Sequence, residues 1–359
     1  MVNNKRIFIT TLLPENKIAK YGLSFAACNF SFNLISGNLF SKVYSIMPLF
    51  VKKMEEINDS RFELIHSKLR TNNFLKIIAI FIEQWIIFKQ IPKDSSVWFY
   101  NLNSINALLF ILLKIFKSSV KTNIIVLDFT PIKKGFGLNS IYLKLINKAD
   151  GRICLANSSI FKTNNSVILP GVVPNRMTEN PEIKKINNQF LLSGVLNENI
   201  SQISLILKVF SKLPNCVLHI TGKSNNEIIE KYTSKYNNII YHKQLPYNEY
   251  IILLHSITYQ LSTRNPNCLE NQCNFPSKII EALLHNRIII STIHYEQLKD
   301  FKYIEISSDE TKMTKDIINL ISLEENKILD FANQSSLVKK LFSTKEWEIK
   351  MNYIESSNK

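Results

Sequence analysis

The sequence lacks several features that define common protein classes. Its five cysteines are odd in number and form no Cys-x-x-Cys pair. This argues against a disulfide framework or a cysteine-based metal site and predicts reduced thiols in a cytoplasmic protein. No group of His, Asp and Glu has metal-ligand spacing, so we expect a metal-independent protein without a bound cofactor. The first residues contain no apolar run long enough for a secretory signal.

No apolar run is long enough to cross a bilayer, which takes about 20 residues. The two most apolar segments, 74–90 and 108–121, are shorter than this and are interrupted by charge. One interpretation is that both are buried helices that connect the strands of an α/β domain. The other is a helix that lies in the membrane interface with lysines on its rim. We favour the second and expect a peripheral contact with an anionic membrane surface, at the inner face of the cell membrane.

Negative charge is scarce in the first half of the chain. Residues 1–170 contain 22 Lys and Arg against 9 Asp and Glu, whereas residues 171–359 contain 22 against 20. A basic half attracts polyanions, which include nucleic acid, an anionic membrane and a phosphorylated substrate. Nucleic acid is the least favoured of these. The lysines are mixed with long aliphatic runs, and the sequence shows neither a helix-turn-helix nor an aromatic stacking pattern.

Both halves alternate short apolar strands with amphipathic helices, a pattern typical of βαβ units and parallel sheets. In the first half the pattern predicts strands at 6–10, 43–47, 97–100, 123–127, 151–156 and from 166, with helices at 22–36, 74–89, 104–117 and 138–148. In the second half it predicts strands at 190–195, 216–222, 239–243, 257–262 and 287–291, with helices at 200–212, 224–236, 248–255, 276–285 and 343–354. Capping-box spacing at 224–227 and 343–346 supports two of these helix starts.

The strongest chemical signal is the segment NFPSKIIEALL at 274–284. Pro276 is tolerated in a first helical turn and brings the backbone close to a ligand in a turn that is poor in glycine. The N–H groups of Ser277 and Lys278 then point out of the helix start and form an anion site suited to phosphate. The Glu281 side chain leans back toward the same spot and can accept hydrogen bonds from ribose hydroxyls. The segment therefore predicts a nucleoside diphosphate site.

The segment 262–292 resembles the donor-binding segment of glycosyltransferase family 4. It is most similar to a bacterial surface-polysaccharide branch that carries Phe-Pro-Ser-Lys before a glutamate. The resemblance implies an α/β GT-B fold, in which two Rossmann-like domains face a cleft and a C-terminal helix returns to the first domain. It implies an acceptor-binding domain at 1–172, a nucleotide-sugar-binding domain at 173–341 and the returning helix at 342–359. The expected activity is retaining transfer of a sugar from a UDP- or GDP-sugar to a lipid-linked saccharide.

The resemblance also assigns roles to individual residues. Glu281 falls on the ribose-binding glutamate, and Phe275, Pro276 and Ser277 fall on the turn that meets the diphosphate. Arg264 falls on an arginine that follows the preceding strand. In the first half, the resemblance suggests that Gly22 lets the backbone approach the acceptor. Among residues that end predicted strands, Gly194 and Gly222 would let the nucleotide approach closely, and Asp128 would bind or position the acceptor.

Two departures from the family pattern concern the charge around the diphosphate. The first glutamate of the Glu-x7-Glu motif falls on Cys273, and the cations that usually follow the first strand of the second domain are absent from GVLNENIS. We expect Arg264 and Lys278, with Lys223 as a third candidate, to stabilise the departing diphosphate instead. Without such replacement, the chain would be a degenerate subunit that binds without turnover.

Each assignment has a structural alternative. Glu281 would simply pair with Lys278 or Arg287 on the helix surface, and Lys278 would be a solvated lysine. Arg264 would cap a neighbouring helix, and Asp128 would be an N-cap. The glycines would serve ordinary turns. His219 alternates into a buried strand, so we expect a hydrogen-bonded core residue there rather than a catalytic base.

Overall fold

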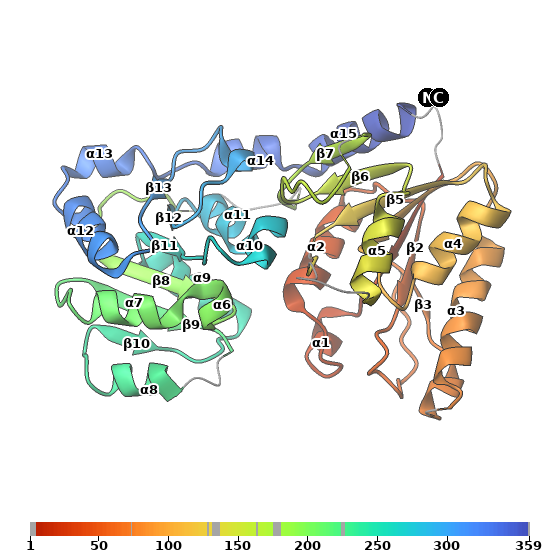
Figure 1. The fold of residues 1–359 in the computed structure, drawn as a ribbon, viewed down its shortest axis with the longest axis horizontal. Coiled ribbons are helices and arrows are strands. Elements are labelled where there is room, and N and C mark those ends of the chain that lie inside the picture. The colour runs from red at the N-terminus through yellow and green to blue at the C-terminus, as the bar shows by residue number, and fades with distance from the viewer. Residues whose placement is uncertain are drawn as a thin grey trace. The chain divides into compact units, whose positions relative to one another are not determined.

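The computed structural model describes residues 5–72, 74–127, 129–130, 137–162, 164–174, 181–223 and 227–357. The chain divides into two compact units, which we call unit 1 (residues 1–176 and 342–359) and unit 2 (residues 177–341). Each unit is a layered α/β structure built on a parallel sheet (Figure 1). In the described part of the chain, no helix is both long and apolar enough to cross a membrane.

The described residues of unit 1 form a seven-stranded sheet in the order β3-β2-β1-β4-β5-β6-β7. Its strands are β1 (Arg6–Thr10), β2 (Lys42–Ile46), β3 (Glu63–Ile65), β4 (Ser96–Tyr100), β5 (Lys121–Val126), β6 (Gly151–Cys154) and β7 (Ser166–Ile168). Its helices are α1 (Glu15–Ile18), α2 (Phe25–Ser36), η1 (Lys68–Thr71), α3 (Lys76–Gln90), α4 (Ala107–Phe116), α5 (Leu138–Ile146) and α15 (Thr344–Ser356). In β1, Ile7 lies opposite Lys42 of β2 and Val97 of β4.

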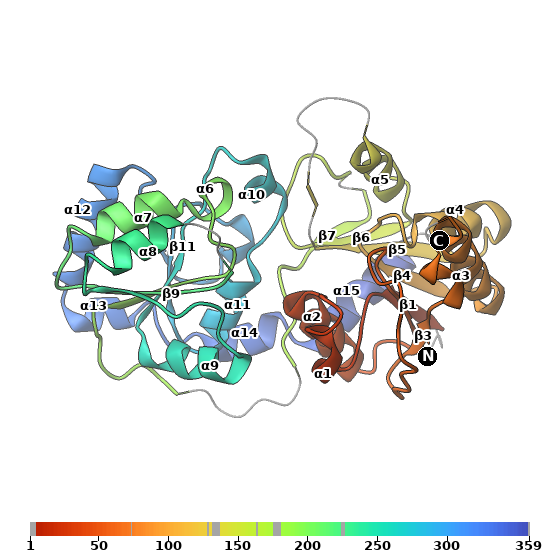
Figure 2. The same cartoon turned by 90° about the horizontal axis from the view of Figure 1, so that it is seen from below.

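The helices of unit 1 cover both faces of this sheet (Figures 1 and 2). α2 and α15 pack together on one face, while α3 and α4 pack together on the other. This division follows from the strand order. The chain first adds strands from β1 toward one edge of the sheet and then, after β3, from β4 toward the other edge. Because crossovers between parallel strands are right-handed, the connections that run toward one edge place their helices on one face, and those that run toward the other edge place theirs on the opposite face.

The described residues of unit 2 form a six-stranded sheet in the order β10-β9-β8-β11-β12-β13. Its strands are β8 (Gln189–Ser193), β9 (Val217–Thr221), β10 (Ile239–Tyr241), β11 (Tyr259–Ser262), β12 (Ile288–Ser291) and β13 (Ile304–Glu305). Its helices are α6 (Glu198–Ser201), α7 (Ile203–Phe210), α8 (Glu227–Thr233), α9 (Tyr247–Ser256), α10 (Leu269–Cys273), α11 (Ser277–Leu284), η2 (Glu296–Leu298), α12 (Glu310–Ile321), α13 (Glu325–Leu329) and α14 (Ser335–Leu341).

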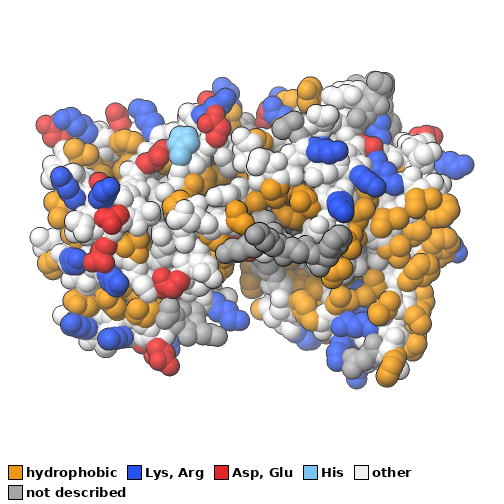
Figure 3. All heavy atoms as spheres, viewed as in Figure 1, with side chains coloured by type: hydrophobic (Ala, Val, Ile, Leu, Met, Phe, Trp, Pro, Cys, Tyr) orange, Lys and Arg blue, Asp and Glu red, His pale blue; other side chains and the backbone are white. Residues whose placement is uncertain are grey.

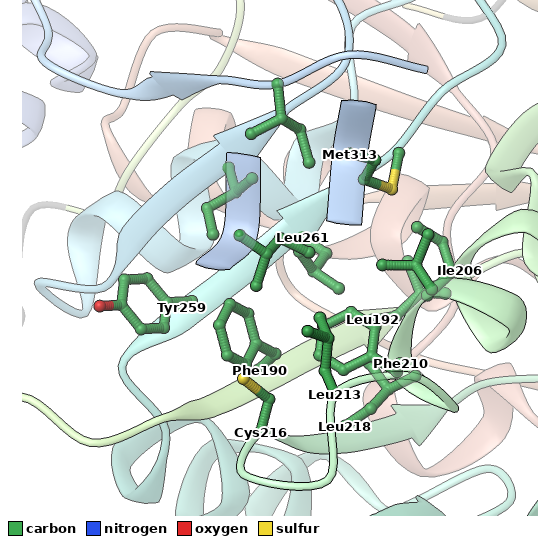
Figure 4. Packing of buried hydrophobic residues seen from close by; sticks show 14 of the residues in the cluster. Phe190, Leu192, Ile206, Phe210, Leu213, Cys216, Leu218, Tyr259, Leu261 and Met313 are labelled. Carbon is green, nitrogen blue, oxygen red and sulfur yellow. The ribbon is translucent and has the colours of Figure 1, made fainter. Parts of the chain in front are cut away.

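The core of unit 2 forms where the central strands meet α7 and α12 (Figure 4). The Phe190 ring of β8 stacks on Tyr259 of β11 with centroids 4.6 Å apart. It also meets Phe210 of α7 edge-to-face at 5.1 Å. All three side chains are fully buried. Edge-to-face and stacked rings of this kind add about 0.5–1.5 kcal/mol each to the burial of their apolar surface.

The strands and crossover helices expected from the sequence are present, with boundaries that move by a few residues. The helix expected at 200–212 is wrong in one respect, because Gln202 adopts a left-handed φ of 51° that separates α6 from α7. The structure adds elements that the pattern did not predict: β3, β13, α1, η1, α10, η2, α12, α13 and α14. Of the two capping boxes, Ser343 accepts the Glu346 N–H at 3.2 Å, whereas residues 224–226 lie outside the described residues.

A buried carboxylate fixes the closing helix α15 on the sheet of unit 1. Glu355 accepts hydrogen bonds from Arg6 of β1 (Nη2, 2.8 Å), Ser96 Oγ (2.6 Å) and Trp98 Nε1 (2.9 Å), the last two on β4. Its backbone carbonyl accepts from Lys121 Nζ of β5. Burial by itself raises the pKa of Glu355, but the hydrogen bonds from Arg6 and Ser96 outweigh it and lower the pKa. Three adjacent strands therefore hold one end of α15.

The same helix approaches the sheet closely at a glycine. A Cβ at Gly151 of β6 would lie 2.0 Å from Ile354 Cγ2, so any other residue there would push α15 away. At the other end of the helix, the fully buried Trp347 donates its indole N–H to the Gly171 carbonyl at 2.8 Å. The two ends of α15 are thus fixed by independent contacts.

The histidines in the core of unit 2 are uncharged structural groups. His219 of β9 is 9% exposed and contacts His242 (2.9 Å) and Gln189 (3.1 Å) through its ring nitrogens, which confirms the expectation of a hydrogen-bonded core residue. His285, after α11, contacts His255 at 2.8 Å. Burial, followed by the charge of the paired histidine, lowers the pKa of both His219 and His285 to about 4.

We predict that Glu355→Ala lowers the free energy of unfolding of unit 1 by about 3–5 kcal/mol, because it leaves the buried Arg6 charge without its partner. All three tryptophans lie in unit 1, so urea unfolding followed by tryptophan fluorescence reports on this unit. The matched control is Glu346→Ala on the same helix, which removes a partly exposed ion pair with Lys350 and should cost under about 1 kcal/mol. Equal losses in the two variants would contradict the role of Glu355.

We also predict that unit 2 loses stability as the pH falls from about 6.5 toward 4. Between these values the unfolded histidines bind protons that the folded His219 and His285 do not, so the free energy of unfolding falls by about 1.4 kcal/mol per pH unit for each proton. Hydrogen exchange of β9 and β12 amides at a series of pH values measures this slope. His219→Gln should reduce it, whereas the same change at the exposed His294 should not.

Candidate functional site

The predicted donor residues of unit 2 follow three neighbouring strands. β9, β8 and β11 are adjacent and parallel, so their carboxyl ends lie at one edge of the sheet. Gly194 directly follows β8, Gly222 directly follows β9, and Arg264 comes two residues after β11. Ligands of open parallel sheets bind at this edge.

The two glycines of this edge are in contact with each other. The Gly194 N–H donates to the Thr221 carbonyl at 3.0 Å, and a Cβ at Gly222 would lie 2.0 Å from the Gly194 carbonyl oxygen. Both glycines have positive φ angles, +115° and +143°, which disfavour any side chain. Gly222 is therefore required by the packing of the two turns. A Cβ at Gly194 would meet no atom of the described residues within 4 Å, so among these residues the turn also has open space beside it.

The helix that carries the chemical motif begins one residue later than expected. Pro276 is the N-cap of α11, with φ −73° and ψ 111°, and Ser277 is the first helical residue. Pro276 is therefore outside the first turn, and at the N-cap it has no side-chain group that could accept a hydrogen bond from the helix start. Among the described residues, no side chain caps this helix start, and Ser277 is exposed. A helix start of this kind favours an anion.

Lys278 and Glu281 form an ion pair on the first turn of α11. Lys278 Nζ lies 2.7 Å from Glu281 Oε2 and 4.0 Å from the centroid of the Tyr250 ring. This is the pairing that the structural alternative anticipated for Glu281. Arg287, the other partner considered, instead donates to the backbone carbonyls of His285 (2.7 Å) and Ile257 (2.9 Å). Burial lowers the pKa of Arg287 to about 10.

Two tyrosines of α9 border the same carboxylate, and the sequence motif did not identify them. Burial, followed by the charge of Glu281, raises the pKa of Tyr250 and raises that of Tyr247 to about 12. Ser193, the last residue of β8, also lies next to the Tyr250 hydroxyl. Tyr250 therefore lies between Glu281 and the end of β8, although its buried hydroxyl makes no hydrogen bond among the described residues. The sequence signal for this pair is their spacing of three residues in PYNEY, which places both on one helix face.

Arg264 is held at its backbone by the Thr292 hydroxyl and at its side chain by α10. Its N–H donates to Thr292 Oγ1 at 2.7 Å, and the same hydroxyl donates to the Arg264 carbonyl at 2.7 Å. Its Nη1 donates to Asn271 Oδ1 of α10 at 2.9 Å. The guanidinium also lies near Tyr295, where its charge opposes the rise in pKa that burial causes. The structural alternative for Arg264 was a cap on a neighbouring helix, and the bond to the Asn271 side chain within α10 is not itself such a cap.

Phe275 and Cys273 are buried in the same region. The Phe275 ring is 4% exposed and packs edge-to-face on Tyr295 at 5.2 Å, so its backbone, and not its side chain, is available to a ligand. Cys273 ends α10 and is 5% exposed. Its buried thiol cannot supply the charge of the glutamate that it replaces in the family pattern. Lys223, after Gly222, is exposed.

The remaining predicted residues belong to unit 1 or are not described. Gly22 lies in the turn between α1 and α2 with φ +67°, and this left-handed angle is by itself a sufficient reason for glycine. Asp128 lies outside the described residues. Within the described ranges, no group of three or more His, Cys, Asp or Glu could hold a metal ion.

Comparisons with known proteins give similarity in fold but not in sequence. No protein-family model matches the chain, and a search of curated proteins found no match. A structure of Anabaena Alr3699/HepE in complex with UDP and glucose is similar with a TM-score of 0.63 and 9% identity, covering 99% of this chain and 100% of that one. A structure of trehalose-6-phosphate from E. coli, bound with UDP-2-fluoro glucose, has a TM-score of 0.65 and 8% identity, covering 99% of both chains. The N-terminal domain of Candida albicans trehalose-6-phosphate phosphatase has a TM-score of 0.63 and 12% identity, covering 98% of this chain and 97% of that one.

At these identities the similarity concerns the fold alone. It extends over nearly the whole length of the chains compared, and both sheets of this protein are parallel with flanking helices. The protein therefore has two Rossmann-like α/β units of the GT-B type, which confirms the fold class expected from the sequence.

Proposed function

We propose that the protein is a retaining glycosyltransferase that moves a sugar from a UDP- or GDP-sugar to a saccharide acceptor. The observation that carries this proposal is the cluster of Gly194, Gly222, Lys278 and Glu281 at the carboxyl ends of the strands of unit 2. It is supported by the fold, which the chain shares with structures that contain UDP and glucose or UDP-2-fluoro glucose.

The donor would bind with its diphosphate at the start of α11 and its ribose at Glu281. The open space beside Gly194 would accept the nucleotide backbone. The Ser277 N–H and the Lys278 ammonium favour phosphate, while the Glu281 carboxylate can accept hydrogen bonds from the two ribose hydroxyls. Lys278 pairs with Glu281 in the described structure, so its positive charge offsets the repulsion between this carboxylate and a bound diphosphate.

The chemical step would depend on stabilising the leaving group. When the bond between the sugar carbon and the phosphate oxygen breaks, the diphosphate keeps the electron pair and gains negative charge. Lys278, the Ser277 N–H and Arg264 are the candidates to stabilise this charge, with Lys223 as a weaker one. The acceptor hydroxyl oxygen would form the new bond to the sugar carbon, and the departing phosphate would accept the proton of that hydroxyl. Retention of configuration follows from the resemblance to family 4, as does the assignment of a lipid-linked acceptor to unit 1 in surface-polysaccharide synthesis.

The second candidate function is a degenerate GT-B subunit that binds its ligand without turnover. The buried Cys273 favours it, because an uncharged thiol stands where the family pattern has a glutamate. The segment after β8 favours it too, since Gly194 is followed by Val195 and no cation. The two functions differ in whether the protein releases nucleoside diphosphate from a donor.

We predict that Glu281→Ala abolishes the thermal stabilisation of the protein by its UDP- or GDP-sugar donor, because the ribose loses its acceptor. The unliganded protein should keep its melting temperature, since Glu281 is partly exposed and its ion pair contributes little. A thermal-shift screen of UDP- and GDP-sugars identifies the donor and measures the loss. Glu324→Ala is the matched control, because it removes another Lys–Glu pair of unit 2, formed with Lys327. An unchanged donor response in Glu281→Ala would refute the ribose assignment.

We predict further that Lys278→Ala and Arg264→Ala lower the rate of donor hydrolysis by about 10²–10³, as expected when a group that stabilises the leaving charge is lost. The measurement is release of UDP or GDP from the donor identified by the screen. Lys327→Ala should leave the rate unchanged. If the wild-type protein binds the donor but releases no nucleoside diphosphate, the degenerate subunit is the correct function.

A further inference from the structure

One face of unit 1 carries apolar side chains where a surface helix normally carries polar ones. The stripe on α3 consists of Ile77 (79% exposed), Ile78, Phe81 and Trp85, and Phe74 precedes it with 92% exposure. These residues are three or four apart, so they lie on one side of the helix. Figure 3 shows hydrophobic side chains gathered over α3 and α4.

The stripe continues onto the neighbouring helix. Ile115 and Phe116, at the end of α4, are 64% and 67% exposed. Phe88 of α3 links the two helices, because its ring stacks on Trp85 at 5.2 Å and meets Phe116 edge-to-face at 6.5 Å. We call this surface the α3–α4 face and define it by Phe74, Ile77, Phe81, Trp85, Ile115 and Phe116.

The orientation of α3 is fixed by two of its polar residues, Glu83 and Gln84, which are buried. Glu83 is fully buried and pairs with the equally buried Arg70, whose Nη1 donates to the Pro48 carbonyl at 2.8 Å. Gln84 is also buried and accepts the Leu109 N–H of α4 at 2.7 Å. A helix that only minimised its apolar exposure would turn these groups outward. The buried ion pair therefore keeps the aliphatic and aromatic side of α3 on the surface.

The segment that carries this face is mostly positive, with eight Lys and Arg against two Asp and Glu in residues 68–121. Four of the eight cations already have partners: Arg70 pairs with Glu83, Lys114 pairs with Asp150, and Lys117 and Lys121 donate to backbone carbonyls. Lys76 and Lys89 stand at the two ends of α3. Lys89 lies 5.8 Å from the Trp85 ring centroid, and Lys117 lies 4.5 Å from that of Phe88.

An anionic lipid surface fits both properties. An apolar stripe with a tryptophan and flanking lysines is typical of a helix that lies at the boundary between headgroups and acyl chains, with the lysines extended to the lipid phosphates. A second copy of the chain fits less well, because two such faces would bring like charges together. We infer that the α3–α4 face seats the protein on an anionic lipid bilayer, with α3 in the plane of the interface. This inference rests on unit 1 and does not depend on the proposed sugar transfer.

The test uses the intact protein and vesicles. The protein should float with vesicles that contain phosphatidylglycerol. A smaller fraction should float with vesicles of pure phosphatidylcholine, and binding to the phosphatidylglycerol vesicles should fall at high salt. Ile77→Asp should weaken binding about tenfold or more, because it places a charge on the buried stripe. Ile252→Asp is the matched control, since Ile252 of unit 2 is equally apolar and 70% exposed.

Tryptophan fluorescence gives a second readout. Trp98 and Trp347 are fully buried, so quenching by brominated lipid should come from Trp85 and disappear in Trp85→Phe. Failure of the wild-type protein to bind anionic vesicles, or equal binding by Ile77→Asp, would overturn the inference. So would a dimer in solution that Ile77→Asp dissociates, because a second copy would then cover the face. Donor hydrolysis in solution, without vesicles, separates any of these outcomes from a failure of the proposed function.

Discussion

The hydrogen bonds to Glu355 are the interaction on which the architecture of unit 1 depends. One carboxylate, buried at the end of α15, joins β1 and β4 through side chains, while its backbone carbonyl binds β5. A buried charge is stable only when its partners satisfy it, so the position of α15 and the register of three strands are specified together. Gly151 adds a steric condition, because only glycine lets Ile354 come this close.

Charge compensation of a different kind organises the candidate site of unit 2. The Lys278–Glu281 pair places opposite charges on a single helical turn, and Tyr250 supports both, with its ring under the ammonium and its hydroxyl beside the carboxylate. The segment that follows β8, residues 194–201, contains no Lys or Arg. Any ligand with a diphosphate would therefore depend on α11 and Arg264 for its electrostatic stabilisation.

Much of the fold could be predicted from the sequence because buried parallel strands are short apolar runs separated by amphipathic helices. Elements that do not follow this alternation of apolar strands and amphipathic helices were not predicted. β3 and β13 are only three and two residues long, and the break at Gln202 depends on a backbone angle that no residue type demands. The candidate site was predicted from a linear motif, and that motif contains the helix start, Lys278 and Glu281. Tyr247 and Tyr250 were not predicted, because they join the site only through the packing of α9.

The order of the elements along the chain has a consequence for biosynthesis. Unit 1 is assembled from residues 1–176 and 342–359, so unit 2 is inserted between its two parts. During translation, Arg6 and the β4 side chains emerge long before the helix that satisfies them. Until Glu355 leaves the ribosome, the Arg6 guanidinium lacks its carboxylate and the apolar face of the nascent sheet that α15 covers is exposed, and exposed apolar surface of this kind is what makes chaperones necessary. Unit 2 has no such dependence and can fold first, although it is made second.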